Sequence, residues 1–172
     1  GVDMGPSAIR YAHLQTKLED LGYEVRDEGN IEVAIAEMCK VTDAKMKYID
    51  CIIPMSRRIA GAVATSVQAK NFPLVLGGDH SLSIGSVRGA ARNRKIGVIW
   101  IDAHADFNTA ETTPSGNIHG MSLAILAGQN RYAHVTALRA DAVNPQGLGM
   151  SKVCSEDSVR RAVAIQMIIN KE

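Results

Sequence analysis

Short apolar runs alternate along this chain with segments of helical spacing. Residues 72–76 and 96–101 are rich in large apolar side chains and are bounded by Gly, Pro or polar residues, a pattern typical of buried parallel strands. A helical segment over 84–93 lies between them, and a polar loop over 108–117 precedes a helix that begins near His119. This order predicts a right-handed βαβ unit, and therefore an α/β domain of three layers, α/β/α, with a mainly parallel sheet.

The segments before and after this unit carry weaker patterns. Pro6 should open a helix that ends at Gly22, because Pro is favourable in a first helical turn and Gly just after a last one. A second helix over 44–70 should be kinked or divided at Pro54. The other expected elements are a strand over 23–25, a loop with one helical turn over 27–42, a strand over 133–137, a turn over 144–149 and a helix over 156–170. We expect a single domain over 1–172.

Composition excludes several classes of protein. Apolar residues make up 46% and charged residues 22% of the chain, with a net charge of +1, so no broad field favours nucleic acid or a membrane surface. No apolar run approaches the ~20 residues of a membrane helix, and the first residues lack the pattern of a signal peptide. Cys39, Cys51 and Cys154 are irregularly spaced, so we expect reduced thiols and a cytoplasmic protein.

Metal-binding residue types follow both predicted strands. The run G-G-D-H at 77–80 closes the first strand, and D-A-H-A-D at 102–106 closes the second. Ligands of open α/β sheets bind at the carboxyl ends of strands, so His80 should meet the second cluster there. Asp102, His104 and Asp106 alternate and would share one face of an extended backbone. The backbone often turns at a strand end, but Asp102 and His104 can still point together after such a turn. Carboxylates with a minority of imidazole suit Mn²⁺ or a similar divalent ion better than structural zinc.

Longer motifs in the same region resemble a known family. The segments G-G-D-H-S, D-A-H-A-D-F-N-T and P-S-G-N-I-H-G-M are similar to those of the ureohydrolases, and so is the opening G-V-D-M-G-P-S-A-I-R. The likeness runs from residue 1 to about 128. Agmatinase-type members share the first two motifs, whereas N-T-x-x-T-x-x-S-G-N-x-H-G, which begins at Asn108, favours the arginase family among them.

The resemblance implies hydrolysis of the guanidinium group of L-arginine to L-ornithine and urea, by a metal-bridged hydroxide at a site with two Mn²⁺ ions. It also implies a homo-oligomeric, cytoplasmic enzyme of arginine metabolism and the urea cycle. Carried over by position, His80, Asp102 and Asp106 hold one ion; His104 holds the other, with Asp102 bridging; Asn108 and Ser115 bind the α-carboxylate, with Asn117 in the same loop; and His119 is the catalytic proton shuttle.

Some of these residues also have simpler explanations. Asn108 and Ser115 are common in loops, where their side chains bond to nearby backbone. His119 could simply begin a helix, and the two glycines before Asp79 need only a tight turn. Asp79 itself is better placed to support a ligand than to be one.

The family's third metal motif has no counterpart here. The resemblance implies a D-x-D on a later strand and a later Glu near the guanidinium, but Asp141 has no partner two residues away. Family members are also longer, with a strand before residue 1 and a C-terminal half beyond this length. We therefore expect weak metal binding, no arginase activity from these 172 residues, and uncovered apolar strand faces. The alternatives are a catalytically silent remnant or association module, and an amidinohydrolase for another guanidino substrate.

Overall fold

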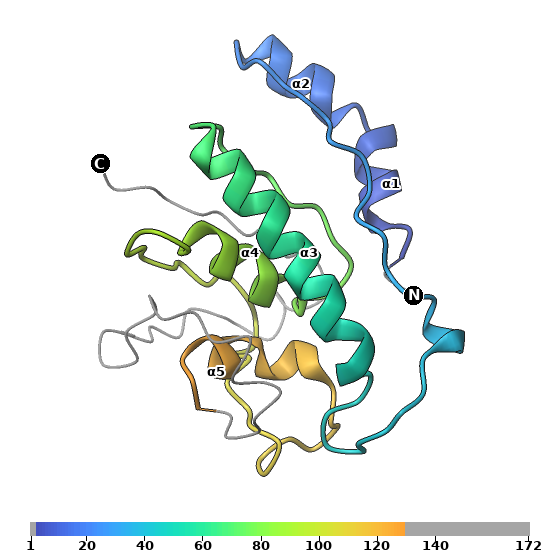
Figure 1. The fold of residues 1–172 in the computed structure, drawn as a ribbon. Helices are drawn as coiled ribbons and strands as arrows, with labels where there is room; N and C mark the ends of the chain where they lie inside the picture. The colour runs from blue at the N-terminus through green and yellow to red at the C-terminus, as the bar shows by residue number, and fades with distance from the viewer. Residues whose placement is uncertain (1–2, 130–172) are drawn as a thin grey trace.

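The computed structural model describes residues 3–129, whose regular structure is helical (Figure 1). The elements expected over 133–137, 144–149 and 156–170 lie outside the described residues. No helix in the described part has the apolar length needed to cross a bilayer. In chain order the elements are α1 (Gly5–Tyr11), α2 (Leu14–Asp20), the 3₁₀ turn η1 (Ala36–Met38), α3 (Ile49–Gln68), α4 (Leu82–Ala90), the 3₁₀ turn η2 (Ile118–Met121) and α5 (Ser122–Leu126).

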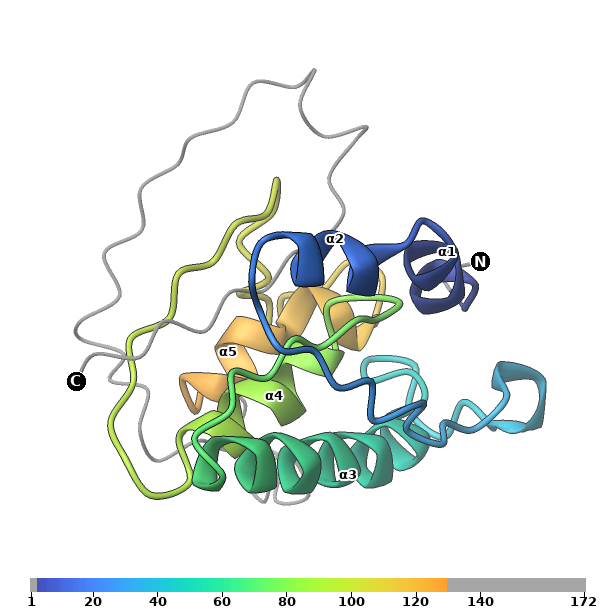
Figure 2. The same ribbon diagram turned by 90° about the horizontal axis from the view of Figure 1, so that it is seen from above.

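The core lies where α4 packs between α3 and α5 (Figure 2). Most of α4 is buried, and two of its glycines meet α3 directly. A Cβ at Gly85 would lie 2.5 Å from the carbonyl oxygen of Ser56, and one at Gly89 would lie 2.5 Å from that of Ala60. The helices therefore approach backbone to backbone, which only glycine allows. The fully buried large side chains of the described core are Met46, Ile84, Ile118, Met121, Ile125, Leu126 and Val87.

The helix over 44–70 is shorter than predicted and is not divided. It spans Ile49–Gln68 and continues through Pro54. Pro54 is the sixth residue of α3, so the helix loses the one hydrogen bond that an N–H there would give to the carbonyl of Asp50, and the ring meets only the first turn. The expected division at Pro54 is therefore wrong.

The two predicted strands form no ladder, and their expected burial is wrong, since each exposes large apolar side chains. Within residues 3–129 no strand forms, and the one β-bridge of this region joins Lys47 and Asn117. Along 96–101, Ile96, Val98 and Trp100 pack toward Val87 and Leu126. Ile99 and Ile101 on the other face are 53% and 64% exposed. A strand needs backbone partners, and without them this run has one packed face and one exposed face rather than the two buried faces of a parallel strand.

The first predicted helix is divided in two. His13 takes a left-handed conformation with φ +60°, which ends α1 and begins α2, and neither helix contains a fully buried residue. In both views α1 and α2 lie to one side of α3, α4 and α5 (Figures 1 and 2). The following segment is tied to α1 by Arg10, whose guanidinium donates to Asp27 at 2.6 Å and holds the pKa of that carboxyl below its ordinary value. The short strand expected over 23–25 is not formed.

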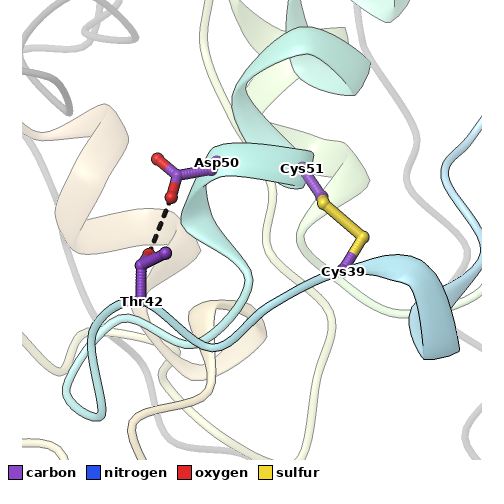
Figure 3. Close-up of a disulfide and its surroundings, with 4 residues drawn as sticks. All are labelled: Cys39, Thr42, Asp50 and Cys51. Atoms are coloured by element: carbon purple, nitrogen blue, oxygen red, sulfur yellow. Dashed lines mark hydrogen bonds between the residues drawn. A yellow bond between two sulfur atoms is a disulfide. The ribbon is translucent and has the colours of Figure 1, made fainter.

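The cysteines differ from the sequence-based expectation. Cys39, just after η1, and Cys51, in the first turn of α3, form a disulfide with Cα atoms 6.5 Å apart (Figure 3). The expectation of reduced thiols is therefore wrong for this pair. The path of residues 39–51 brings the two sulfurs together, and spacing along the chain does not reveal that path.

Candidate metal centre

The position of His80 is fixed from three directions. It follows the extended segment 72–76 and immediately precedes α4, and it is 9% exposed. Its carbonyl oxygen accepts hydrogen bonds from the hydroxyls of Ser83 at 2.6 Å and Ser122 at 3.2 Å. Its ring stacks on Trp100, with centroids 4.0 Å apart and planes 20° from parallel. The imidazole therefore has little freedom to turn away from the next two side chains.

Two carboxylates converge on one nitrogen of this ring. The Nδ1 atom of His80 lies 2.7 Å from Oδ2 of Asp102 and 2.9 Å from Oδ2 of Asp106. Potential ligand atoms of the three residues all lie within 4.8 Å of one another. One imidazole nitrogen and two carboxylate oxygens are a donor set that fits a hard or borderline divalent cation.

The two carboxylates change the pKa of His80. Burial lowers that pKa, but the hydrogen bond and charge of Asp106, followed by the charge and hydrogen bond of Asp102, outweigh burial and raise it above its ordinary value. A cation at this position is therefore favoured, whether it is the imidazole proton or a metal ion that replaces it.

The backbone of Asp106 is held in an uncommon conformation. Its φ is +48°, in the left-handed region, and the residue is only 7% exposed. Its carbonyl oxygen accepts the amides of Leu123 and Ala124, at 3.0 and 3.3 Å, in the first turn of α5. Aspartate tolerates this conformation better than most residues. The start of α5 thus fixes the direction from which this carboxylate reaches His80.

His104 lies beside the group rather than in it. Its side chain is 73% exposed, with Nδ1 3.3 Å from Oδ1 of Asp102. The chain bends over 102–104, and the amide of His104 donates to the same Oδ1 at 2.8 Å. The turn that the sequence allowed at the strand end is present in place of an extended backbone, and Asp102 and His104 still lie together. Asp102 still directs one oxygen to each histidine.

The predicted substrate residues lie in an ordered polar loop. Asn108 and Ser115 are exposed and Asn117 is half-buried. The hydroxyl of Thr112 donates to Oδ1 of Asn108 at 3.2 Å, and the amide of Asn117 donates to Oγ of Ser115 at 3.2 Å. Local bonds of this kind were the simpler explanation for these residues. They leave the exposed side chains able to accept a ligand as well.

His119 lies at the start of a helical turn, which was one of the two interpretations of the sequence. Its ring also faces a carboxylate. It lies in η2, with Nδ1 3.7 Å from Oδ2 of Asp79. The other oxygen of Asp79 accepts the amide and hydroxyl of Ser81. Asp79 is thus absent from the convergent group and sits between the His80 turn and His119.

Sequence reasoning missed two supports of the site. Trp100 was read only as part of an apolar strand, although alternation from Ile96 places it on the same face as Asp102. The hydroxyl of Thr113 is buried and accepts the amide of Gly116 at 2.9 Å, which shapes the loop before Asn117. Alternation could have identified Trp100, whereas nothing in the local sequence distinguishes Thr113 from its neighbours.

Comparison with known proteins agrees with the motifs. The arginase family model matches residues 1–166. The chain is 51% identical over 129 residues to an arginase of Bacillus subtilis (strain 168) and 49% identical over 130 residues to one of Bacillus caldovelox. These matches cover 74% of this chain but only 43% and 44% of the relatives, so the chain spans less than half the length of either.

Solved arginase structures are similar as well. The native arginase of Bacillus caldovelox at pH 5.6 has a TM-score of 0.75 at 46% identity, covering 80% of this chain and 46% of that one. An arginase of Entamoeba histolytica in complex with L-ornithine has a TM-score of 0.64 at 25% identity, covering 85% and 50%. From its motifs, its matched length and its structure, this chain belongs to the arginase family.

Proposed function

We propose that this chain carries one part of the active site of an arginase, which hydrolyses L-arginine to L-ornithine and urea with two Mn²⁺ ions. The observation that carries the proposal is the convergence of Nδ1 of His80 with one oxygen each of Asp102 and Asp106. Membership of the arginase family supports the reaction. When bound, two such cations would polarise a water molecule for attack on the guanidinium carbon.

The geometry supports distinct roles for the two histidines. His80, Asp102 and Asp106 would hold one ion, since their ligand atoms already face one another. His104 would hold the other. Asp102 would bridge the pair, because its Oδ2 faces His80 and its Oδ1 faces His104. A bridging carboxylate also offsets the repulsion between two adjacent cations.

The polar loop would recognise the amino-acid end of the substrate. Asn108 and Ser115 present exposed amide and hydroxyl groups, which can donate to an α-carboxylate, and Asn117 lies in the same loop. The Entamoeba histolytica arginase, similar to this chain, is described in complex with L-ornithine, which carries such a carboxylate. This supports arginine over guanidino compounds that lack it.

His119 would move the proton. Half-exposed imidazole is well suited to proton transfer near neutral pH. Its Nδ1 lies 3.7 Å from Oδ2 of Asp79, and an imidazole held at this place would pass a proton to the leaving amine.

We also infer the layered α/β/α fold from the extended segments. Ile96, Val98 and Trp100 cover the helical layer, while Ile99 and Ile101 present a second apolar face suited to another layer. The D-x-D carboxylates implied by the family would likewise come from outside residues 1–172. The 172 residues alone would therefore fail to turn over arginine.

The test is urea release from L-arginine and from agmatine, with added Mn²⁺. The purified 172-residue chain, its mass checked against 18.4 kDa, should release none. The longest product of the same gene should hydrolyse arginine, and agmatine much more slowly because it lacks the α-carboxylate. Equal rates on both substrates would replace arginase by a broader guanidino hydrolase, and no release from either would favour a silent protein.

A further inference from the structure

The disulfide Cys39–Cys51 closes a loop at the edge of the molecule. Cys39 follows η1 and Cys51 lies in the first turn of α3, twelve residues apart (Figure 3). Both residues are half-buried, and their neighbours Met38 and Val41 are 79% and 49% exposed. A small thiol in solution can therefore approach this bond without unfolding the core.

The closed loop supports the proposed substrate loop through its backbone. The amide of Lys47 donates to the carbonyl oxygen of Gly116 at 2.9 Å, and Lys47 pairs with Asn117 in a parallel bridge. The ammonium group of Lys45 donates to the carbonyl oxygen of Thr113 at 3.3 Å. A movement of 44–47 would therefore be transmitted to the loop over 113–117.

The loop over 44–47 and the loop over 113–117 are in direct backbone contact. Gly116 has φ +75°, and a Cβ there would collide with the carbonyl oxygen of Ala44. The two backbones thus touch directly, immediately beside Ser115. Because no flexible side chain separates them, displacement of one loop is not absorbed before it reaches the other.

A weaker closure remains when the disulfide is absent. The hydroxyl of Thr42 donates to Asp50 at 2.7 Å, and Met46 and Ile49 are buried in the core (Figure 3). Reduction should therefore loosen this segment without releasing it, because these contacts persist. A graded change of this kind suits regulation better than a bond whose loss unfolds the protein.

We propose that Cys39 and Cys51 form a thiol–disulfide switch that sets the order of the substrate loop over 113–117. The switch rests on the proposed function only in its effect on arginine. In oxidation, a low-molecular-weight disulfide RSSR accepts two electrons from the two thiols through a mixed disulfide, which yields the Cys39–Cys51 bond and two RSH. Reduction is the reverse. Disulfides in reducing compartments are commonly of this reversible kind.

Hydrogen exchange at the amide of Lys47 tests the switch without any enzymatic activity. The background variant is Cys154→Ser, so that Cys39 and Cys51 are the remaining cysteines. Reduction with dithiothreitol should speed exchange at Lys47 several-fold while amides of α4 stay protected. The variant that adds Cys39→Ser should exchange like the reduced protein, with or without reductant.

Three results would overturn the switch. They are equal exchange at Lys47 in both redox states, faster exchange throughout α4 as well, and failure of oxidised glutathione to protect the two thiols from alkylation. In a urea-releasing product of the gene, reduction should also raise KM for arginine about fivefold, the low end of coupling between linked sites, with kcat retained. Redox-dependent exchange together with no urea release from the longest product of the gene would contradict the proposed function and leave the switch standing.

Discussion

The crossing of α3 and α4 has no space for a side chain at Gly85. An added Cβ would lie 2.5 Å from the carbonyl oxygen of Ser56 and 2.8 Å from Cβ of Ile59. Neither atom is the end of a flexible side chain, so Gly85→Ala must push the helices apart. Ser83, in the first turn of α4, donates a hydrogen bond to the carbonyl oxygen of His80. The same movement should therefore disturb the convergence of His80 with its two carboxylates.

The size of the effect follows from two opposing contributions. Overpacking of a core costs about 1–3 kcal/mol. Alanine recovers about 1 kcal/mol over glycine inside a helix. We therefore expect Gly85→Ala to lower the free energy of unfolding by up to about 2 kcal/mol. Gly61 in α3 is the matched control: a Cβ there meets nothing within 4 Å, so Gly61→Ala should stabilise by about 0.5–1 kcal/mol.

Urea unfolding followed by far-ultraviolet circular dichroism measures both variants against the parent chain. The two substitutions are chemically identical and both lie in helices, so propensity alone predicts the same sign for each. Opposite signs are expected if the backbone contact is real. A Gly85→Ala protein as stable as the Gly61→Ala protein would refute the packing of α4 on α3 described above.

Three further predictions concern charge, association and substrate. Because carboxylates raise the pKa of His80, protonation of this ring should stabilise the metal-free protein fully below the unfolded pKa of about 6.5, and this stabilisation should disappear as pH rises through the folded pKa. The affinity for Mn²⁺ should rise over the same pH interval, because the metal ion replaces the proton. An affinity that does not change with pH would contradict the role of His80. The chain should self-associate through its uncovered face, and the double change Ile99→Lys with Ile101→Lys should reduce the mass seen by light scattering; an unchanged mass would count against that face. In a urea-releasing product of the gene, Ser115→Ala and Asn108→Ala should raise KM for arginine more than they lower kcat, and the reverse pattern would remove both from carboxylate binding.

The sequence predicted what depends on local pattern and on long motifs. Helical spacing located α3 and α4, and the two motifs brought His80 to Asp102 and Asp106. The break at His13 was not predictable, because the helical apolar spacing runs through it and does not show that His13 takes the left-handed conformation. The two apolar runs could not show that their backbone lacks the partners that make a strand, or that Ile99 and Ile101 stay exposed.

Contacts between distant segments were the other limit. The Cys39–Cys51 bond depends on the path of the chain between the two residues, which residue spacing does not encode. The outward position of His104 depends on a bend made by the side chain of Asp102, a local competition between hydrogen bonds that an alternating pattern does not represent.

Titration of Mn²⁺ into the 172-residue chain, with free Mn²⁺ followed by electron paramagnetic resonance, tests the central claim most directly. The variants are Asp102→Asn and, as a matched control, Asp20→Asn at the exposed end of α2. We predict that the parent chain binds Mn²⁺ weakly and loses it on dialysis. The Asp20→Asn variant should keep this weak binding, and the Asp102→Asn variant should lose it. Equal binding by the two variants, or two tightly held ions in the parent chain, would contradict a partial metal site built on His80, Asp102 and Asp106.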